Sequence, residues 1–176
     1  MTEISPDRSI SLDDYFVTSS VHFVDMGVFA GIWPLAGETN DELIARIYPL
    51  VHEKNPNMEI FTKDTMPPRW HWSNNRRIAP LNIVAKNGWW LHTHSSGTIN
   101  RVGGAHGYDN SAVDMTAIVV ASGPAFRNDG KMLDLILNID IYEMISSILD
   151  ITPAPNNGSL ARISSVFAAG DDDDEL

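Results

Sequence analysis

Short apolar runs that alternate with helical patterns are the feature that most limits what this chain can fold into. The runs are rich in Val, Ile, Phe and Trp, and they cover residues 21–33, 58–62, 78–85 and 115–121. Runs of this length and composition, bounded by Pro, Gly or Asn, are typical of strands. Strands that are apolar throughout pack between two layers of helices. The sequence therefore predicts an α/β fold with a mostly parallel sheet.

Two segments have the spacing of an amphipathic helix. In the first, Thr39 or Asn40 provides an N-cap, and Pro49 either kinks the helix or ends it early. The residues of its predicted buried face are Leu43, Ile47, Leu50 and Val51. In the second, Asn138 provides the N-cap and two prolines at 153 and 155 close the segment. Its predicted buried face consists of Ile141, Tyr142, Ile145, Ile148 and Leu149.

The net charge of −11 excludes two classes of partner. A protein that binds a nucleic-acid polymer or an anionic membrane surface needs clustered Lys and Arg to meet the phosphates. Part of the negative charge is a run of acids at 171–175, within an acidic tail that we expect over residues 161–176. The chain has no cysteine, which rules out disulfides and zinc sites built from thiolates.

No membrane segment is expected in this chain. The most apolar stretch, residues 21–36, is short and is interrupted by charged residues, glycines and a proline. The first eight residues are polar and acidic, unlike a signal peptide. The localisation is left open by these observations.

A glycine-rich stretch at residues 92–110 has no periodicity, and a loop of this length is usually functional or mobile. Its candidate metal ligands are His92, His94, His106 and Asp109. Imidazole nitrogen and carboxylate oxygen suit zinc, and glycines beside His106 let the backbone approach closely. The alternative is that these are polar loop residues whose side chains hydrogen-bond a turn.

Aromatic and basic residues ahead of this loop have two interpretations each. The tryptophans either stack on a nucleotide base or pack against the sheet, and burial statistics favour packing; they are Trp70, Trp72, Trp89 and Trp90. The arginines either meet phosphate or are solvated surface charges, and the second is favoured; they are Arg69, Arg76 and Arg77.

Residues 104–110 read Gly-Ala-His-Gly-Tyr-Asp-Asn. They resemble the G-x-H-G-Y-D-N motif of the nucleotide pyrophosphatase/phosphodiesterase family, within the alkaline phosphatase superfamily. The similarity continues through residues 115–126, 138–142 and 152–158, and softer matches extend it over most of residues 10–160. The resemblance implies the C-terminal portion of a three-layer α/β/α fold, incomplete here, with residues 1–160 forming part of the catalytic domain.

The chemistry implied by this resemblance is hydrolysis of nucleotide phosphodiester or pyrophosphate bonds, with a small-molecule nucleotide as substrate and a nucleoside monophosphate as product. In the family the histidine of the motif binds one of two zinc ions, which implies a role as zinc ligand for His106 alone. Asp109 either orients His106 through a hydrogen bond or caps the turn that follows. No catalytic residue is expected in this chain.

This chain departs from the family pattern, because the other zinc ligands and the threonine nucleophile motif do not occur in it. Its first two residues, Met1 and Thr2, resemble the end of the family's Ser-Asp-His-Gly-Met-Thr segment, which favours a start at an internal methionine. We therefore expect the isolated chain to bind zinc poorly and to be inactive. The alternative is a non-catalytic remnant or a truncated gene model with no activity of its own. The resemblance leaves open whether the intact parent protein is secreted or membrane-anchored. A sulfatase or a phosphoglycerate mutase-like protein is disfavoured by the Tyr-Asp-Asn ending of the motif.

Overall fold

The computed structural model describes residues 1–127, 129–130, 132 and 134–168. These residues form two compact units, one of residues 1–117 and one that begins at residue 118. The candidate residues of the glycine-rich loop all belong to the first unit.

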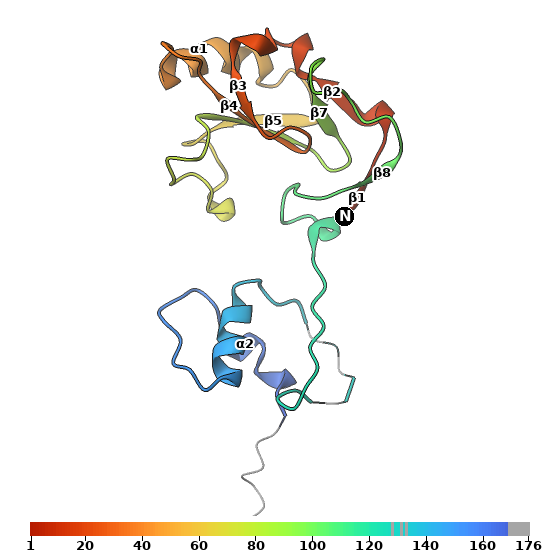
Figure 1. Cartoon of the computed structure of the whole chain (residues 1–176), viewed down its shortest axis with the longest axis vertical. Coiled ribbons are helices and arrows are strands. Elements are labelled where there is room, and N and C mark those ends of the chain that lie inside the picture. Colours follow the sequence, from red (N-terminus) through yellow and green to blue (C-terminus); the bar gives the residue numbers. More distant parts are fainter. Residues whose placement is uncertain (128, 131, 133, 169–176) are drawn as a thin grey trace, which may run out of the picture. The chain divides into compact units, whose positions relative to one another are not determined.

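A four-stranded sheet lies at the centre of the first unit (Figure 1). Its order is β3 (His22–Val24), β4 (Phe29–Trp33), β6 (Leu81–Ala85) and β5 (Met58–Thr62). The α/β class is confirmed, but every neighbouring pair in this sheet is antiparallel, so the prediction of a mostly parallel sheet is wrong for these strands. For β3 and β4 the reason is that residues 21–33 form a hairpin and not one strand. Asp25 and Gly27 have positive φ angles of 63° and 130° and reverse the chain between β3 and β4.

Two small strand pairs hold the N-terminal residues against the glycine-rich loop. β1 (Thr2–Ile4) pairs antiparallel with β8 (Gly103–Ala105). β2 (Ser9–Ser11) pairs with β7 (Trp90–His92), and this is the one parallel pairing among the described residues. The first eleven residues therefore fix the start of the loop at β7 and its interior at β8, and β8 leads directly to the histidine of the motif.

The helix α1 (Asn40–Val51) has Thr39 as its N-cap, one of the two caps that the sequence predicts, and the cap is a capping box. The Thr39 hydroxyl accepts a hydrogen bond from the Glu42 amide at 3.3 Å, and the Glu42 carboxylate accepts one from the Thr39 amide at 2.8 Å. Pro49 lies inside the helix and does not end it. The buried face is formed by Leu43, Ile47 and Val51, whereas Leu50, which was predicted to share it, is 44% exposed.

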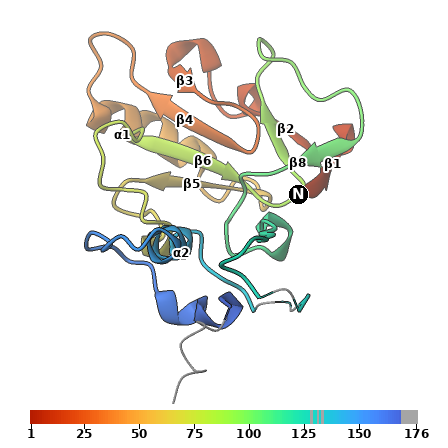
Figure 2. The same ribbon diagram turned by 60° about the horizontal axis from the view of Figure 1, so that its bottom comes forward.

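The core of the first unit lies between α1 and one face of the sheet, with α1 running along that face in Figure 2. Leu81 and Ile83 of β6 are fully buried and belong to the same cluster as Leu43 and Ile47 of α1. Val84, which follows Ile83 in β6, points to the opposite face. That opposite face is where a cavity forms.

Short 3-10 helices connect these elements in the first unit. They are Pro6–Arg8, Leu12–Asp14, Thr18–Ser20, Pro68–Trp70 and Val113–Met115.

The second unit contains α2 (Asp140–Ile148) and two 3-10 helices, Leu160–Arg162 and Ser164–Val166. The predicted N-cap at Asn138 is wrong, because the residue that flanks α2 is Ile139 and it makes no side-chain cap bond. The predicted buried face is also wrong for most of its members within this unit. The exposed fractions are 45% for Tyr142, 49% for Ile145, 40% for Ile148 and 59% for Leu149.

The predicted strand at 115–121 is not formed. Residues 113–115 make a 3-10 helix and the residues that follow have no regular structure. Ile118 and Val120 are 90% and 89% exposed. Residues with strong β preference form a strand only where a neighbouring strand accepts and donates their backbone hydrogen bonds. Within the described part of the chain, no strand pairs with this segment.

The proposed boundary at residue 160 stays a prediction. Residues 160–168 are still folded, and Ile163 is fully buried. The acidic run at 171–175 lies outside the described residues. None of the helices that the structure describes has the length and apolar character needed to cross a bilayer.

Candidate functional site

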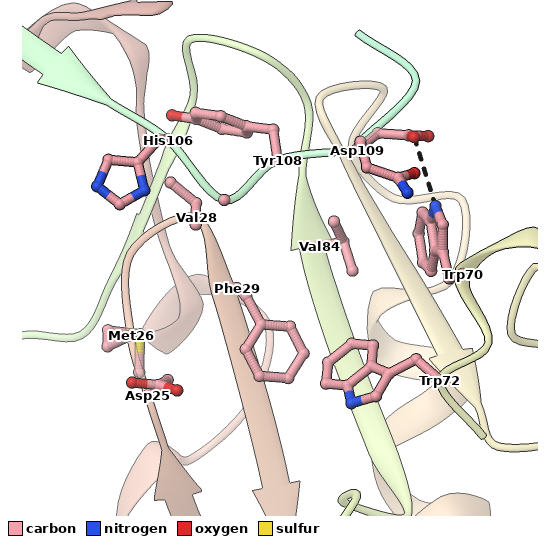
Figure 3. Close-up of a pocket in the computed structure, with 12 residues that line it drawn as sticks. Asp25, Met26, Val28, Phe29, Trp70, Trp72, Val84, His106, Tyr108 and Asp109 are labelled. Carbon is pink, nitrogen blue, oxygen red and sulfur yellow. Dashed lines mark hydrogen bonds between the residues drawn. The ribbon is translucent and has the colours of Figure 1, made fainter. Parts of the chain in front are cut away.

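His106 lies on the loop that leaves β8, and its imidazole is exposed at the mouth of a cavity (Figure 3). The residues on either side of it are anchored in the fold. Ala105 and Tyr108 are each 6% exposed, and the Tyr108 hydroxyl donates a hydrogen bond to the carbonyl oxygen of Trp89 at 2.8 Å. The loop is therefore fixed on both sides of His106, while the imidazole of His106 itself is exposed.

Burial raises the pKa of Tyr108 to about 12, so its phenol is neutral and remains a donor across the physiological range. Between Tyr108 and the histidine, Gly107 has a φ of +93°, and a Cβ placed there would lie 3.2 Å from the Cγ2 of Val28. Glycine is needed at this position both for the left-handed turn and for the close approach to Val28.

Asp109 is held by partners other than the motif histidine. Both of its oxygens accept hydrogen bonds from the Arg69 guanidinium, one of them at 2.7 Å. It also accepts from the Trp70 indole at 3.4 Å and from the amide and hydroxyl of Ser111 at 2.9 and 2.8 Å. Arg69 lowers the pKa of this carboxyl well below its usual value. These contacts match the interpretation of Asp109 as the cap of a turn, while a role in orienting His106 stays a prediction.

A cavity of about 560 Å³ lies on the sheet face opposite α1. Its floor is formed by β4 and β6, and the loop 106–110 makes one wall (Figure 3). The residues that line it are Asp25, Met26, Val28, Phe29, Trp70, Trp72, Val84, His106, Gly107, Tyr108, Asp109 and Asn110. The lining joins aromatic rings to a small number of polar groups, which is the usual composition of a small-molecule site.

The other predicted ligands lie apart from this cavity. His92 is on β7, with a buried Nδ1 that has no hydrogen-bond partner in the described part of the chain. His94 is exposed, and its Nδ1 lies 3.8 Å from the carboxylate of Asp13. Neither histidine lines the cavity that His106 borders.

The described residues do not by themselves make a zinc site. In residues 1–168, leaving out 128, 131 and 133, no three His, Asp or Glu side chains come close enough to share a metal ion. A structural zinc needs about four protein ligands and a catalytic zinc about three. His106 supplies one imidazole donor, so no hydrolytic step can be assigned to this chain's own residues.

The tryptophans divide into two groups. Trp70 and Trp72 line the cavity, whereas Trp89 and Trp90 pack against the core, as burial statistics favour. Trp72 meets Phe29 edge-on, with ring centroids 4.7 Å apart. The side chains of Arg76 and Arg77 are exposed and do not line the cavity, whereas Arg69 is engaged by Asp109.

Sequence reasoning missed the contribution of β4 and its preceding turn. Asp25, Met26 and Phe29 lie some 80 residues from the motif and join it only because β4 pairs with β6 at the centre of the sheet. Periodicity carries no information about such long-range pairing. A signal was nonetheless present in the sequence, since an Asp and a Gly interrupt the apolar run at 21–33.

Comparisons with known proteins agree with the motif. The sequence profile of the Type I phosphodiesterase / nucleotide pyrophosphatase family matches residues 1–109. Bis(5'-adenosyl)-triphosphatase enpp4 of Xenopus laevis is 38% identical over 168 residues, which is 96% of this chain and 35% of that protein. Human ectonucleotide pyrophosphatase/phosphodiesterase family member 5 is 32% identical over 167 residues, or 95% of this chain and 33% of that protein.

Solved structures give the same result. Human ectonucleotide pyrophosphatase/phosphodiesterase 5 superimposes with a TM-score of 0.83 at 30% identity, covering 95% of this chain and 42% of that one. An inactive variant of the murine protein in complex with AMP matches with a TM-score of 0.81 at 30% identity, covering 94% and 42%. The chain thus spans about a third of the length of the curated relatives and less than half of the solved chains. By its sequence profile and its fold, this chain belongs to the type I phosphodiesterase/nucleotide pyrophosphatase family.

Proposed function

We propose that this chain is a segment of a metal-dependent hydrolase that acts on phosphodiester or pyrophosphate bonds of nucleotides. Its contribution to the metal site is the imidazole of His106, and zinc is the metal that suits this donor. The observation that carries the proposal is the presentation of His106, exposed on a loop that buried Ala105 fixes on one side and Tyr108 and Asp109 fix on the other. When bound in a complete site, such a metal polarises a phosphoryl oxygen.

The substrate follows from the relatives. Those of Xenopus laevis and of Homo sapiens bear the name bis(5'-adenosyl)-triphosphatase, and the murine structural neighbour holds AMP. We therefore propose an adenine nucleotide or dinucleotide as the substrate, with a nucleoside monophosphate as product. The net charge of −11 still argues against a nucleic-acid polymer.

The isolated chain is proposed to lack activity. One imidazole without further ligands leaves zinc mostly hydrated. Isothermal titration of the chain with zinc is expected to show no tight, saturable binding, and a nitrophenyl ester of a nucleotide is expected to persist unhydrolysed. Clear turnover that the His106→Ala substitution abolishes would refute this part of the proposal. A non-catalytic remnant predicts the same inactivity, so a second experiment is required to separate the two.

That experiment places this chain in Xenopus laevis enpp4 in exchange for the residues it matches. A folded chimera is expected to hydrolyse bis(5'-adenosyl) triphosphate and to lose both activity and bound zinc when His106 is replaced by Ala. His71→Ala is the matched control, because His71 is also exposed but lies outside the cavity. A folded chimera that binds zinc equally well with and without the His106 imidazole would contradict the proposal and favour the remnant.

A further inference from the structure

Residues 116–121 form an exposed apolar run, which we name the unpaired segment. They read Thr-Ala-Ile-Val-Val-Ala, and all six residues are exposed. The exposed fractions are 90% for Ile118, 48% for Val119 and 89% for Val120. Single apolar residues are common at a protein surface, whereas a contiguous run of them marks an interaction site or an aggregation-prone segment.

The backbone of the unpaired segment is extended and makes no regular structure. Thr116 has φ −68° and ψ 139°, and residues 116–122 form neither a helix nor a strand (Figure 1). Among the residues that the structure describes, none donates a hydrogen bond to the carbonyls of residues 117–122 or accepts one from their amides. A row of free N–H and C=O groups along an extended chain is a template on which another strand can pair.

The unpaired segment is complementary to a second copy of itself. In an extended strand alternate side chains point to opposite faces, so Ile118 and Val120 share one face and Val119 lies on the other. Both faces are apolar, and residues 115–126 contain no charged side chain. Six or seven residues with high β preference, no charge and no proline are the sequence signature of strands that stack in register. In such a stack each backbone group pairs with the copies above and below it.

The residues on either side set the length of the stretch that can stack. Asp114 precedes it, and aligned carboxylates of neighbouring copies would repel one another. Gly123 and Pro124 follow it, and proline has no amide hydrogen to donate to a neighbouring strand. The stretch that can pair therefore ends at residue 122.

Other surfaces of a second copy are poorer partners for this segment. The edge strand β3 has three residues, and the other edge strand, β5, carries Glu59, whose side chain is 56% exposed. Short or charged edges are protected against pairing. The face of α2 that holds Ile145 is apolar, but the backbone groups of a helix are bonded within the helix.

We propose that the unpaired segment is a self-association site, at which copies of this chain pair as in-register β-strands. The backbone groups of residues 117–121 gain partners there, and Ile118, Val119 and Val120 leave water. The net charge of −11 opposes the approach of two copies, so the assembly is expected to become faster as salt screens this repulsion.

The test follows assembly of the full chain by sedimentation and thioflavin T fluorescence. About 0.5 M sodium chloride, where the Debye length is about 4 Å, removes most of the repulsion between copies. The assembled protein is expected to give fibre diffraction at about 4.7 Å and about 10 Å, the spacings between strands and between sheets. Hydrogen exchange at the amides of residues 117–121 is expected to slow by at least about tenfold on assembly.

Substitutions within and beside the unpaired segment make the test specific. Val120→Lys places a charge in every layer of the stack and is expected to lengthen the assembly half-time by at least about tenfold. Val120→Ile keeps the β preference and is expected to change the half-time by less than about twofold. Val113→Lys is the matched control, because Val113 is 83% exposed and adds the same charge, but lies in the 3-10 helix Val113–Met115. It is expected to leave the half-time unchanged.

Three results would overturn the proposal. In the first, the chain stays monomeric at concentrations of about 1 mM. In the second, Val113→Lys delays assembly as much as Val120→Lys does. In the third, assembly persists in Val120→Lys but is suppressed by Ile145→Lys, or the new protection lies on β5, and the association then uses another surface. Circular dichroism and the urea midpoint of each variant show that it is folded. No hydrolysis is measured, so these outcomes are independent of the proposed catalytic function.

Discussion

The guanidinium of Arg69 meets the carboxylate of Asp109 side-on, through two parallel N–H···O contacts that join residues 40 positions apart. This pair links the 3-10 helix Pro68–Trp70 to the motif loop, and so joins two walls of one cavity. A bidentate arginine–carboxylate pair fixes the orientation of both partners as well as their distance. The loop that carries His106 therefore cannot shift without breaking the pair of Arg69 and Asp109.

The strength of this link can be measured by a double-mutant cycle of Arg69→Met and Asp109→Asn. The side chain of Arg69 is 50% exposed, so solvent screening keeps the coupling free energy favourable but small in urea unfolding followed by tryptophan fluorescence. The pKa of Asp109 is lowered from its ordinary 3.8, so this stabilisation is fully present above that pH and is lost as the pH falls towards the lower value. Arg46 and Glu38 form the control pair, since they lie outside the cavity. A coupling of zero within error would show that this ion pair does not hold the loop.

Tyr108→Phe tests the second anchor of the loop. Removing the hydroxyl leaves the carbonyl of Trp89 without that donor, and the expected loss is about 1 kcal/mol of unfolding free energy. Burial raises the pKa of Tyr108 to about 12, so the neutral phenol stabilises the fold below about pH 10 and this contribution is lost as the pH rises through 12. Absorbance titration of the native chain is expected to show one phenol with a pKa of about 12. If Tyr108→Phe leaves that late step in place, the assignment is wrong.

In the second unit, Asp140 and Arg162 are predicted to hold the ends of the folded segment together. The Asp140 side chain is fully buried and accepts from Arg162 Nε at 2.8 Å, from its terminal nitrogen at 2.6 Å, and from the amides of Leu137 and Ser159 at 2.9 Å each. Arg162→Met leaves this carboxylate buried without its cation. Hydrogen exchange at the amides of Leu137 and Ser159 is expected to accelerate by at least about tenfold.

The double variant Asp140→Asn with Arg162→Met is the control for this prediction. It removes the charge as well as its partner, so part of the lost protection is expected to return. Arg162 lowers the pKa of Asp140 from 3.8, and protection is therefore present above that pH and lost as the pH falls towards the lower value. Equal exchange rates in the single and double variants would show that the ion pair does not hold this segment.

Elements that depend on neighbouring residues could be predicted from the sequence, and the pairing of distant strands could not. The N-cap at Thr39, the strand Met58–Thr62 and the core of β6 are each set by residues within a few positions of one another. The antiparallel direction of β3 and β4 depends on a turn at Asp25, whose positive φ no periodicity predicts. The motif around His106 was identified through the family resemblance alone. The cavity next to it could not be predicted, because its floor forms only when β4 pairs with β6.

The two helices also show that the sequence pattern does not predict long-range packing. Both carry an amphipathic pattern, but a pattern states only which residues prefer burial and says nothing of whether a partner surface is available. α1 packs against the sheet, and its Leu43 and Ile47 are completely buried. Ile145 of α2 has the same chemistry and remains 49% exposed within its unit.

This contrast gives a matched pair of substitutions. Leu43→Ala is expected to cost about 2–5 kcal/mol, because it opens a cavity in a fully buried cluster. Ile145→Ala is expected to change stability by less than about 0.5 kcal/mol, because half of the side chain already faces water. All five tryptophans lie in residues 1–117, so their fluorescence in urea reports the first substitution, and hydrogen exchange of the α2 amides reports the second. A large loss of α2 protection on Ile145→Ala would mean that this face is covered in solution, and it would make the apolar residues of α2 part of a buried interface.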